Sequence, residues 1–194
     1  MRALRDCEAV VHAVLGQPVN SLTTAAFVVG GLIVMVRTRH VWVGIASVAT
    51  GIGSFLFHGP MPPYAEWAHD ATLAWLLLVV GSHGRSWESW ARIPGLLVIA
   101  AIVAVPGTAY PLGVALAAGA IVLLLMEDRS PATLGPLTLL VVVAIIGRLG
   151  STGGPLCDPD SIWQPHGLWH LGAATAVTWW AIARKEDPLP RRLS

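Results

Sequence analysis

The sequence predicts an all-α membrane protein with seven transmembrane helices. Of its 194 residues, 55% are hydrophobic and only 12% are charged, whereas a soluble domain carries roughly a quarter charged residues. Apolar stretches recur along the whole chain, and its length leaves no room for a sizeable soluble domain beside them. We therefore expect residues 1–194 to form a single membrane domain. The net charge of +1 is too small to indicate a nucleic-acid partner.

Seven apolar stretches can be placed in order, separated by proline, glycine or charged residues. They run from Leu22 to Val36, Val41 to Phe57, Ala65 to Gly81, Ile93 to Val105, Tyr110 to Met126, Leu134 to Gly147 and Gly167 to Ala183. The fourth is the weakest because Pro94 and Pro106 bracket it, so six spans is the alternative count. We expect the first stretch to start membrane insertion, since residues 1–16 lack the continuous apolar core of a cleavable signal peptide.

Lysine and arginine are divided unequally between alternate connections. One set holds Arg37, Arg39, Arg85, Arg92, Arg129, Arg184, Lys185, Arg191 and Arg192, and the other holds Arg2, Arg5 and Arg148. Because cytoplasmic connections are enriched in these residues, the N-terminus is predicted to lie outside and the C-terminus in the cytoplasm. Cys7 and Cys157 then both lie on the outer side, where a disulfide can persist.

The start of the seventh stretch carries two histidines, His166 and His170, four residues apart. On a helix such residues lie on one face about one turn apart, where they can bind one metal ion together. Pro165 suits the first turn of that helix. Catalytic zinc usually has three protein ligands and one open position, so a third ligand is expected from elsewhere in the chain.

Further polar residues interrupt the apolar stretches at the same predicted depth. Ser54 and His58 close the second stretch, again four residues apart, and Asp70 opens the third. Because successive helices alternate in direction, all three meet His166 and His170 at the outer side. Singly, each could be an interhelical hydrogen-bonding group or a helix cap. Together they favour a functional site, since unpaired ionisable groups inside a membrane are costly.

The remaining histidines are expected to lie outside this site. His69 neighbours Asp70, and adjacent residues on a helix point about 100° apart. His12, His40 and His83 fall in tails or loops.

These residues resemble the pattern of the superfamily of seven-helix membrane hydrolases. That superfamily includes alkaline ceramidases, the adiponectin and progestin receptors, and lipid-remodelling enzymes of GPI anchors. The shared pattern is Ser-x-x-x-His at the end of the second helix, an Asp about a dozen residues later, and His-x-x-x-His in the seventh. The resemblance spans nearly the whole chain.

The chain looks most similar to the alkaline ceramidases, and in particular to a bacterial member. These enzymes also place the N-terminus outside, and an Asp-x-Cys-Glu-like segment and an Asn-Thr/Ser pair occur near their first helix. Here these features correspond to Asp6-Cys7-Glu8 and Asn20-Ser21. A bacterial relative implies the cytoplasmic membrane, with the active site towards the periplasm.

The resemblance implies a zinc-dependent enzyme that hydrolyses lipid amides. Its implied zinc ligands are His58, His166 and His170, its catalytic residues are Ser54 and Asp70, and its disulfide joins Cys7 and Cys157. Asp70 would act as general base and then general acid, and Ser54 would donate to the developing oxyanion. The substrate would be a ceramide or another N-acyl lipid from the bilayer, and an ester lipid fits the same chemistry.

The resemblance is less complete for calcium. Ceramidases have a calcium site near the N-terminus, and Asp6 and Glu8 match two of its acidic positions, but Val10 and Gln17 stand where other ligands would be expected. The match to a calcium site is therefore partial.

The main alternative is a non-enzymatic receptor, sensor or transporter in which the metal site is structural. A transporter favours internal repeats or broken helices, and the sequence shows no such repeat. A retinal photoreceptor needs a lysine within the seventh helix, whereas the only lysine, Lys185, follows it. The oligomeric state stays open.

Overall fold

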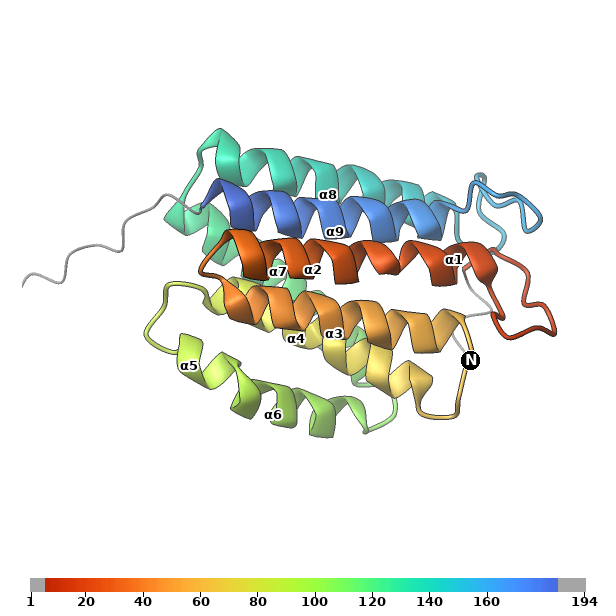
Figure 1. The fold of residues 1–194 in the computed structure, drawn as a ribbon, viewed down its shortest axis with the longest axis horizontal. Coiled ribbons are helices and arrows are strands. Elements are labelled where there is room, and N and C mark those ends of the chain that lie inside the picture. The colour runs from red at the N-terminus through yellow and green to blue at the C-terminus, as the bar shows by residue number, and fades with distance from the viewer. Residues whose placement is uncertain (1–5, 185–194) are drawn as a thin grey trace, which may run out of the picture.

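The computed structural model describes residues 6–184, and these form a bundle of helices without any strand (Figure 1). The helices are α1 (Pro18–Thr23), α2 (Ala25–Arg37), α3 (Val41–His58), α4 (Ala65–Ser82), α5 (Glu88–Ala91), α6 (Ile93–Val103), α7 (Ala109–Glu127), α8 (Pro131–Leu149) and α9 (Pro165–Ala183). The predicted all-α class is therefore confirmed for the described part of the chain.

A helix covers each of the seven predicted stretches, although several ends differ. Only Thr24 separates α1 from α2, so the first helical segment begins at Pro18 rather than Leu22. Proline at the first helical position is favoured because its missing N–H has no partner there in any case. The fourth stretch ends at Val103 rather than Val105, and the short α5 precedes it.

Four helical segments are long and apolar enough to cross a membrane. They are Pro18–Arg37, Val41–His58, Ala109–Glu127 and Pro131–Leu149. In the 18-residue apolar stretches of α7 and α8, only 11% and 17% of the residues are buried inside the bundle. Most of their apolar side chains therefore face outward, as lipid contact requires. These features indicate a membrane protein.

The count of seven spans stays a prediction, because the remaining helices are either less apolar or too short. α4 has 18 residues and α9 has 19, but both carry polar residues of the candidate site. α6 has only 11 residues, which amounts to about 16 Å of helix, whereas the hydrocarbon core is about 30 Å thick.

Long helices that follow one another in the chain run antiparallel along the long axis of the bundle (Figure 1). α2 packs between α3 and α9, α4 packs on α3, and α8 packs on α9, while α6 and α7 both contact α4. As a result, the end of α3 and the starts of α1, α4 and α9 lie at one end of the bundle. We call this the site end.

Glycine lets α2 and α3 approach closely. A Cβ atom on Gly31 would lie 2.6 Å from the carbonyl oxygen of Gly44, and one on Gly44 would lie 2.7 Å from that of Gly31. Small residues at such contacts are typical of membrane helix pairs. The same packing is reinforced by the Ser47 hydroxyl, which donates to the carbonyl of Phe27 at 3.0 Å.

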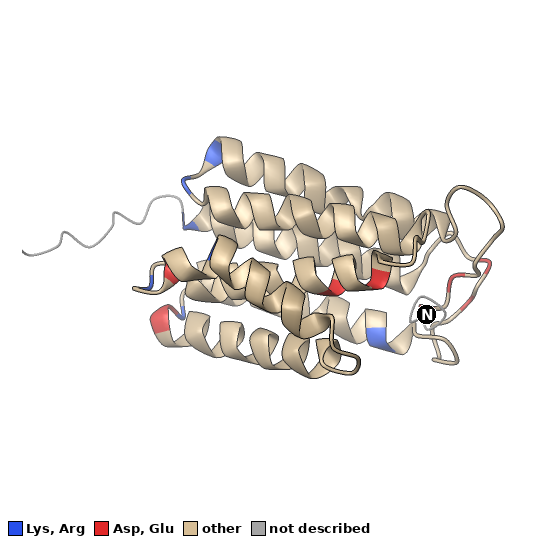
Figure 2. Cartoon of the chain, turned by 90° about the horizontal axis from the view of Figure 1, so that it is seen from below, with Lys and Arg blue, Asp and Glu red and all other residues tan. Residues whose placement is uncertain are grey.

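Basic residues gather at the end opposite the site. Figure 2 shows most arginines of the described residues there, whereas acidic residues occur at both ends. Five residues of the charge count lie outside the described residues: Arg2, Arg5, Lys185, Arg191 and Arg192.

Arg184 is a buried basic residue at the end of the bundle opposite the site, and it links several elements there. Its guanidinium donates to Glu127 at 2.6 Å and to Thr133 at 3.2 Å, which ties the end of α9 to the turn between α7 and α8. Asp128 lies in the same turn. Hydrogen bonds from Thr133 and then Ser130 lower the pKa of its carboxyl to about 2, so Asp128 stays ionised well below neutral pH.

Candidate metal centre

The local sequence places three histidines at the site end. α3 ends at His58, directly before Gly59. α9 begins at Pro165, so His166 and His170 lie in its first two turns, on one face of the helix. Helical periodicity therefore places His166 and His170 side by side on α9, and the packing of the bundle brings His58 of α3 next to them.

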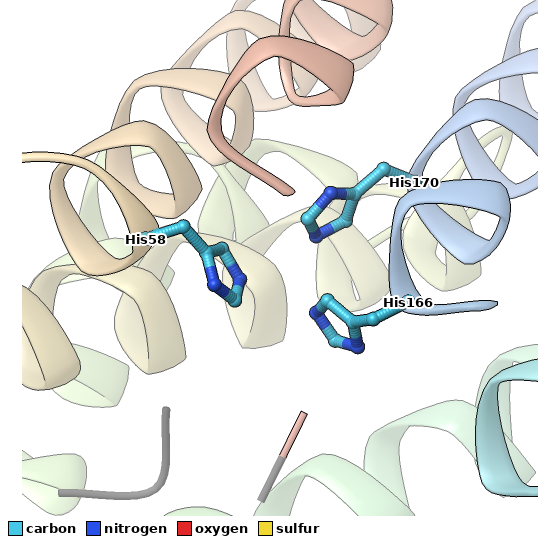
Figure 3. A group of neighbouring side chains, drawn as sticks. All are labelled: His58, His166 and His170. Carbon is cyan, nitrogen blue, oxygen red and sulfur yellow. The ribbon is translucent and has the colours of Figure 1, made fainter. Parts of the chain in front are cut away.

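The three imidazole rings converge. His58 extends from α3, and the two α9 histidines point towards it (Figure 3). The ring centroids lie 4.9 Å apart for His58 and His166, 5.1 Å for His58 and His170, and 4.5 Å for His166 and His170. His58 and His170 are buried, whereas the His166 side chain is 21% exposed. His166 is thus the most exposed of the three.

This cluster has the properties of a metal site. One ring nitrogen from each histidine lies within 4.8 Å of the others, and it is the only such group of three or more histidines, cysteines or carboxylates among the described residues. The Nε2 atoms of His58 and His166 are buried without a hydrogen-bond partner. Leaving buried nitrogens unpaired is costly, and a bound metal ion removes that cost. Three imidazoles suit zinc well.

Each histidine also has a polar neighbour at its second ring nitrogen. Nδ1 of His58 lies 2.7 Å from Oε1 of Gln17, and Nδ1 of His170 lies 3.1 Å from the Thr23 hydroxyl. Nδ1 of His166 lies 3.6 Å from a carboxylate oxygen of Asp6. Gln17 and Thr23 were not singled out as site residues in the sequence, because nothing in their spacing relates them to the histidines.

Ser54 lies one helical turn before His58 on α3 and is 2% exposed. Asp70 lies in α4, and its carboxylate is 3.2 Å from Nδ1 of His69. The predicted catalytic roles of Ser54 and Asp70 stay predictions, although both residues lie towards the site end of helices that pack against each other.

His69 is not one of the three clustered histidines, but it lies closer to them than the sequence indicates. Its ring stacks on Phe57 at a centroid distance of 4.9 Å and lies 6.3 Å from the ring of His58. The angle between neighbouring residues separates His69 from Asp70 at the helix surface, but the long imidazole side chain turns back towards the carboxylate. His69 therefore belongs to the surroundings of the metal centre.

The two acidic residues considered for calcium have partners within the protein. The Glu8 carboxylate accepts the backbone N–H groups of Val19 at 2.7 Å and Asn20 at 2.8 Å, so it caps the start of α1. Asp6 faces His166. Burial raises the pKa of Asp6 to about 6, against the opposing effect of His69. Calcium binding by Asp6 and Glu8 stays a prediction, to which these contacts add no support.

A disulfide lies at the site end of the bundle. Cys7 and Cys157 are bonded, with their Cα atoms 5.4 Å apart, and these are the two cysteines that the ceramidase resemblance pairs. The bond joins the segment before α1 to the loop before α9. Gln164 orders the same loop, because its side-chain amide donates to the carbonyls of Asp158 at 3.0 Å and Ser161 at 2.7 Å.

Comparison of the chain with protein-family models, with curated proteins and with solved structures finds no match in any of the three. Family membership is therefore not shown, and the ceramidase resemblance rests on the residues quoted above. What the structure itself gives is a helical, membrane-type bundle with a three-histidine cluster that can hold a metal ion.

Proposed function

We propose that this protein is a zinc-dependent hydrolase of lipid amides, similar to alkaline ceramidases, that works inside the membrane. The observation that carries this proposal is the convergence of three histidines at the site end, two of them with buried, unpartnered Nε2 atoms. Structural zinc sites usually have four protein ligands, whereas catalytic sites have three. Three ligands therefore favour a catalytic site over the structural site of a receptor or sensor.

The proposal includes a topology of seven spans with the site towards the outside. Two features support it: the helices over all seven apolar stretches and the concentration of basic residues at the opposite end, which the positive-inside rule assigns to the cytoplasm. In a bacterial cell the site would then face the periplasm, where the Cys7–Cys157 disulfide is stable.

The residues around the cluster have roles in this proposal. A zinc ion held by the three histidines supplies a Lewis acid and lowers the pKa of a bound water towards neutrality. Asp70 accepts a proton from the attacking water and delivers it to the amide nitrogen as the carbon–nitrogen bond breaks. Ser54 donates a hydrogen bond to the carbonyl oxygen, where negative charge develops. The products are a fatty acid and an amine.

A groove on the bundle suits the acyl chain of such a substrate. It lies between α2 and α9, has a volume of about 480 Å³, and is lined mainly by apolar side chains that include Ala26, Ile33 and Ala174. Ala174 follows His170 by one helical turn on α9, so the groove runs along the helix that carries two of the three histidines. A long acyl chain leaves the bilayer only at high cost, and a membrane-facing groove lets it remain there.

The test is fatty-acid release by the purified protein in lipid or detergent, followed by mass spectrometry. Three substrates with the same acyl chain should be compared: a ceramide, a simpler N-acyl amide and an ester. We expect release from at least one amide at a rate above that from the ester. Release from the ester alone would show an esterase instead, and binding without release from any substrate would favour a receptor.

A further inference from the structure

The residues next to the Nδ1 atoms of the three histidines all come from one stretch of the chain, which the sequence did not predict. Asp6, Gln17 and Thr23 all come from residues 6–23, which we call the N-terminal segment. The histidines themselves come from α3 and α9. One continuous piece of chain thus contacts the side of every ring that faces away from the metal position.

Other hydrogen bonds of Gln17 and Thr23 indicate which atom donates in their contacts with His58 and His170. The Gln17 amide nitrogen donates to the carbonyl of Glu8 at 2.8 Å, so Oε1 is the atom that faces His58 and it can only accept. The Thr23 hydroxyl lies 2.9 Å from the carbonyls of both Val19 and Asn20. Its proton is directed to these carbonyls, so its oxygen accepts from His170.

These directions indicate the tautomer of the rings. His58 must carry its proton on Nδ1, because Oε1 of Gln17 can only accept. The Thr23 hydroxyl favours the same tautomer in His170, because its own proton is directed to backbone carbonyls. The lone pair of a neutral ring then lies on Nε2, the atom that faces the cluster. The Asp6 carboxylate lies 3.6 Å from Nδ1 of His166, beyond hydrogen-bond distance, and its negative charge favours the same tautomer in His166. Partners of this kind orient metal-binding histidines and raise their basicity.

We infer that the N-terminal segment is the positioning element of the metal centre, with Gln17, Thr23 and Asp6 acting as positioning residues for His58, His170 and His166. This inference rests on the proposed function only in that the cluster binds a metal. It assigns to the segment a specific effect, which is to set the affinity of the site for zinc.

The N-terminal segment is attached to the rest of the protein close to Asp6 and at Gln17. Cys7, next to Asp6, is bonded to Cys157. The backbone N–H of Gln17 donates to the carbonyl of His58 at 2.8 Å, and that of Gly16 donates to the carbonyl of Gly59 at 2.9 Å. The segment therefore contacts α3 through both its backbone and the Gln17 side chain. Such support reduces the freedom that the ligands would lose on binding a metal.

Thr23 offers the sharpest test, because a matched control exists beside it. Thr23→Val keeps the shape of the side chain and removes the acceptor for His170, whereas Thr23→Ser retains the hydroxyl. Thr24→Val removes a neighbouring hydroxyl that donates only to the carbonyl of Ser21, at 2.7 Å. Zinc affinity should be measured by chelator competition on the full chain, and the absorption spectrum of the cobalt-substituted protein should be recorded in parallel.

We expect Thr23→Val to weaken zinc binding about tenfold to a hundredfold, the usual effect of losing such a partner, and to change the cobalt spectrum. Thr23→Ser should restore wild-type affinity, and Thr24→Val should leave it unchanged. The thermal stability of the metal-free protein should be equal in the two valine variants. Equal zinc affinity in Thr23→Val and Thr24→Val would overturn the inference, as would a loss of stability confined to Thr23→Val. Wild-type protein that binds no zinc would instead overturn the metal centre itself.

Discussion

The Asp70→Asn variant should hydrolyse a long-chain N-acyl amide about a hundredfold more slowly than the wild type, or slower still, while it binds a normal amount of zinc. Asparagine keeps the size and much of the hydrogen bonding of the side chain but cannot accept a proton from water. General acid–base groups typically contribute a factor of this size. Fatty-acid release and zinc content should be measured on the same preparation.

Two further variants serve as controls for Asp70→Asn. Asp160→Asn removes a carboxylate from an exposed loop at the site end and should leave the rate unchanged. His69→Gln removes the ring whose Nδ1 lies 3.2 Å from Asp70, so its rate should fall, but less than that of Asp70→Asn. If Asp70→Asn lost its zinc, Asp70 would be a metal ligand or a support for one, and its assignment as a proton-transfer residue would be wrong.

Replacing any one of the three histidines with alanine should remove the metal. The wild type should carry about one zinc per chain, and His58→Ala, His166→Ala and His170→Ala should each carry close to none, because only three protein ligands are available. Hydrolysis should fall to background in all three. Metal analysis by mass spectrometry provides the measurement.

The matched control for these variants is His12→Ala, which removes an exposed histidine from the loop before α1. Its zinc content should equal that of the wild type. An unchanged zinc content in the three site variants would contradict the site assignment, whatever their activity.

Much of the fold could be predicted because local signals define it. Apolar stretches bounded by proline, glycine and charged residues gave helices at the expected places, and the four-residue spacing of His166 and His170 gave one face of α9. Such spacings depend only on helix geometry. The start of the first helical segment at Pro18 was missed because α1 contains the polar residues Asn20 and Ser21, which interrupt the apolar pattern.

The surroundings of the histidines could not be predicted in the same way. Gln17 and Thr23 reach the cluster because the segment before α2 folds against α3 and α9, and the disulfide and backbone bonds to Gly59 and His58 hold it there. No periodicity encodes such contacts. The closeness of His69 to the cluster could not be predicted for a related reason: the angle between helical neighbours describes where side chains leave the helix, but it does not describe where a long side chain ends.

The direct test of the central claim is to remove zinc from the purified wild-type protein with a chelator, return it in measured amounts, and follow fatty-acid release from an N-acyl lipid throughout. If His58, His166 and His170 form the centre of a zinc hydrolase, release should stop when the metal is removed and return in full at about one zinc per chain. Release that continues in the zinc-free protein would contradict the account. So would a zinc-loaded protein that binds lipid and releases no fatty acid from any amide or ester.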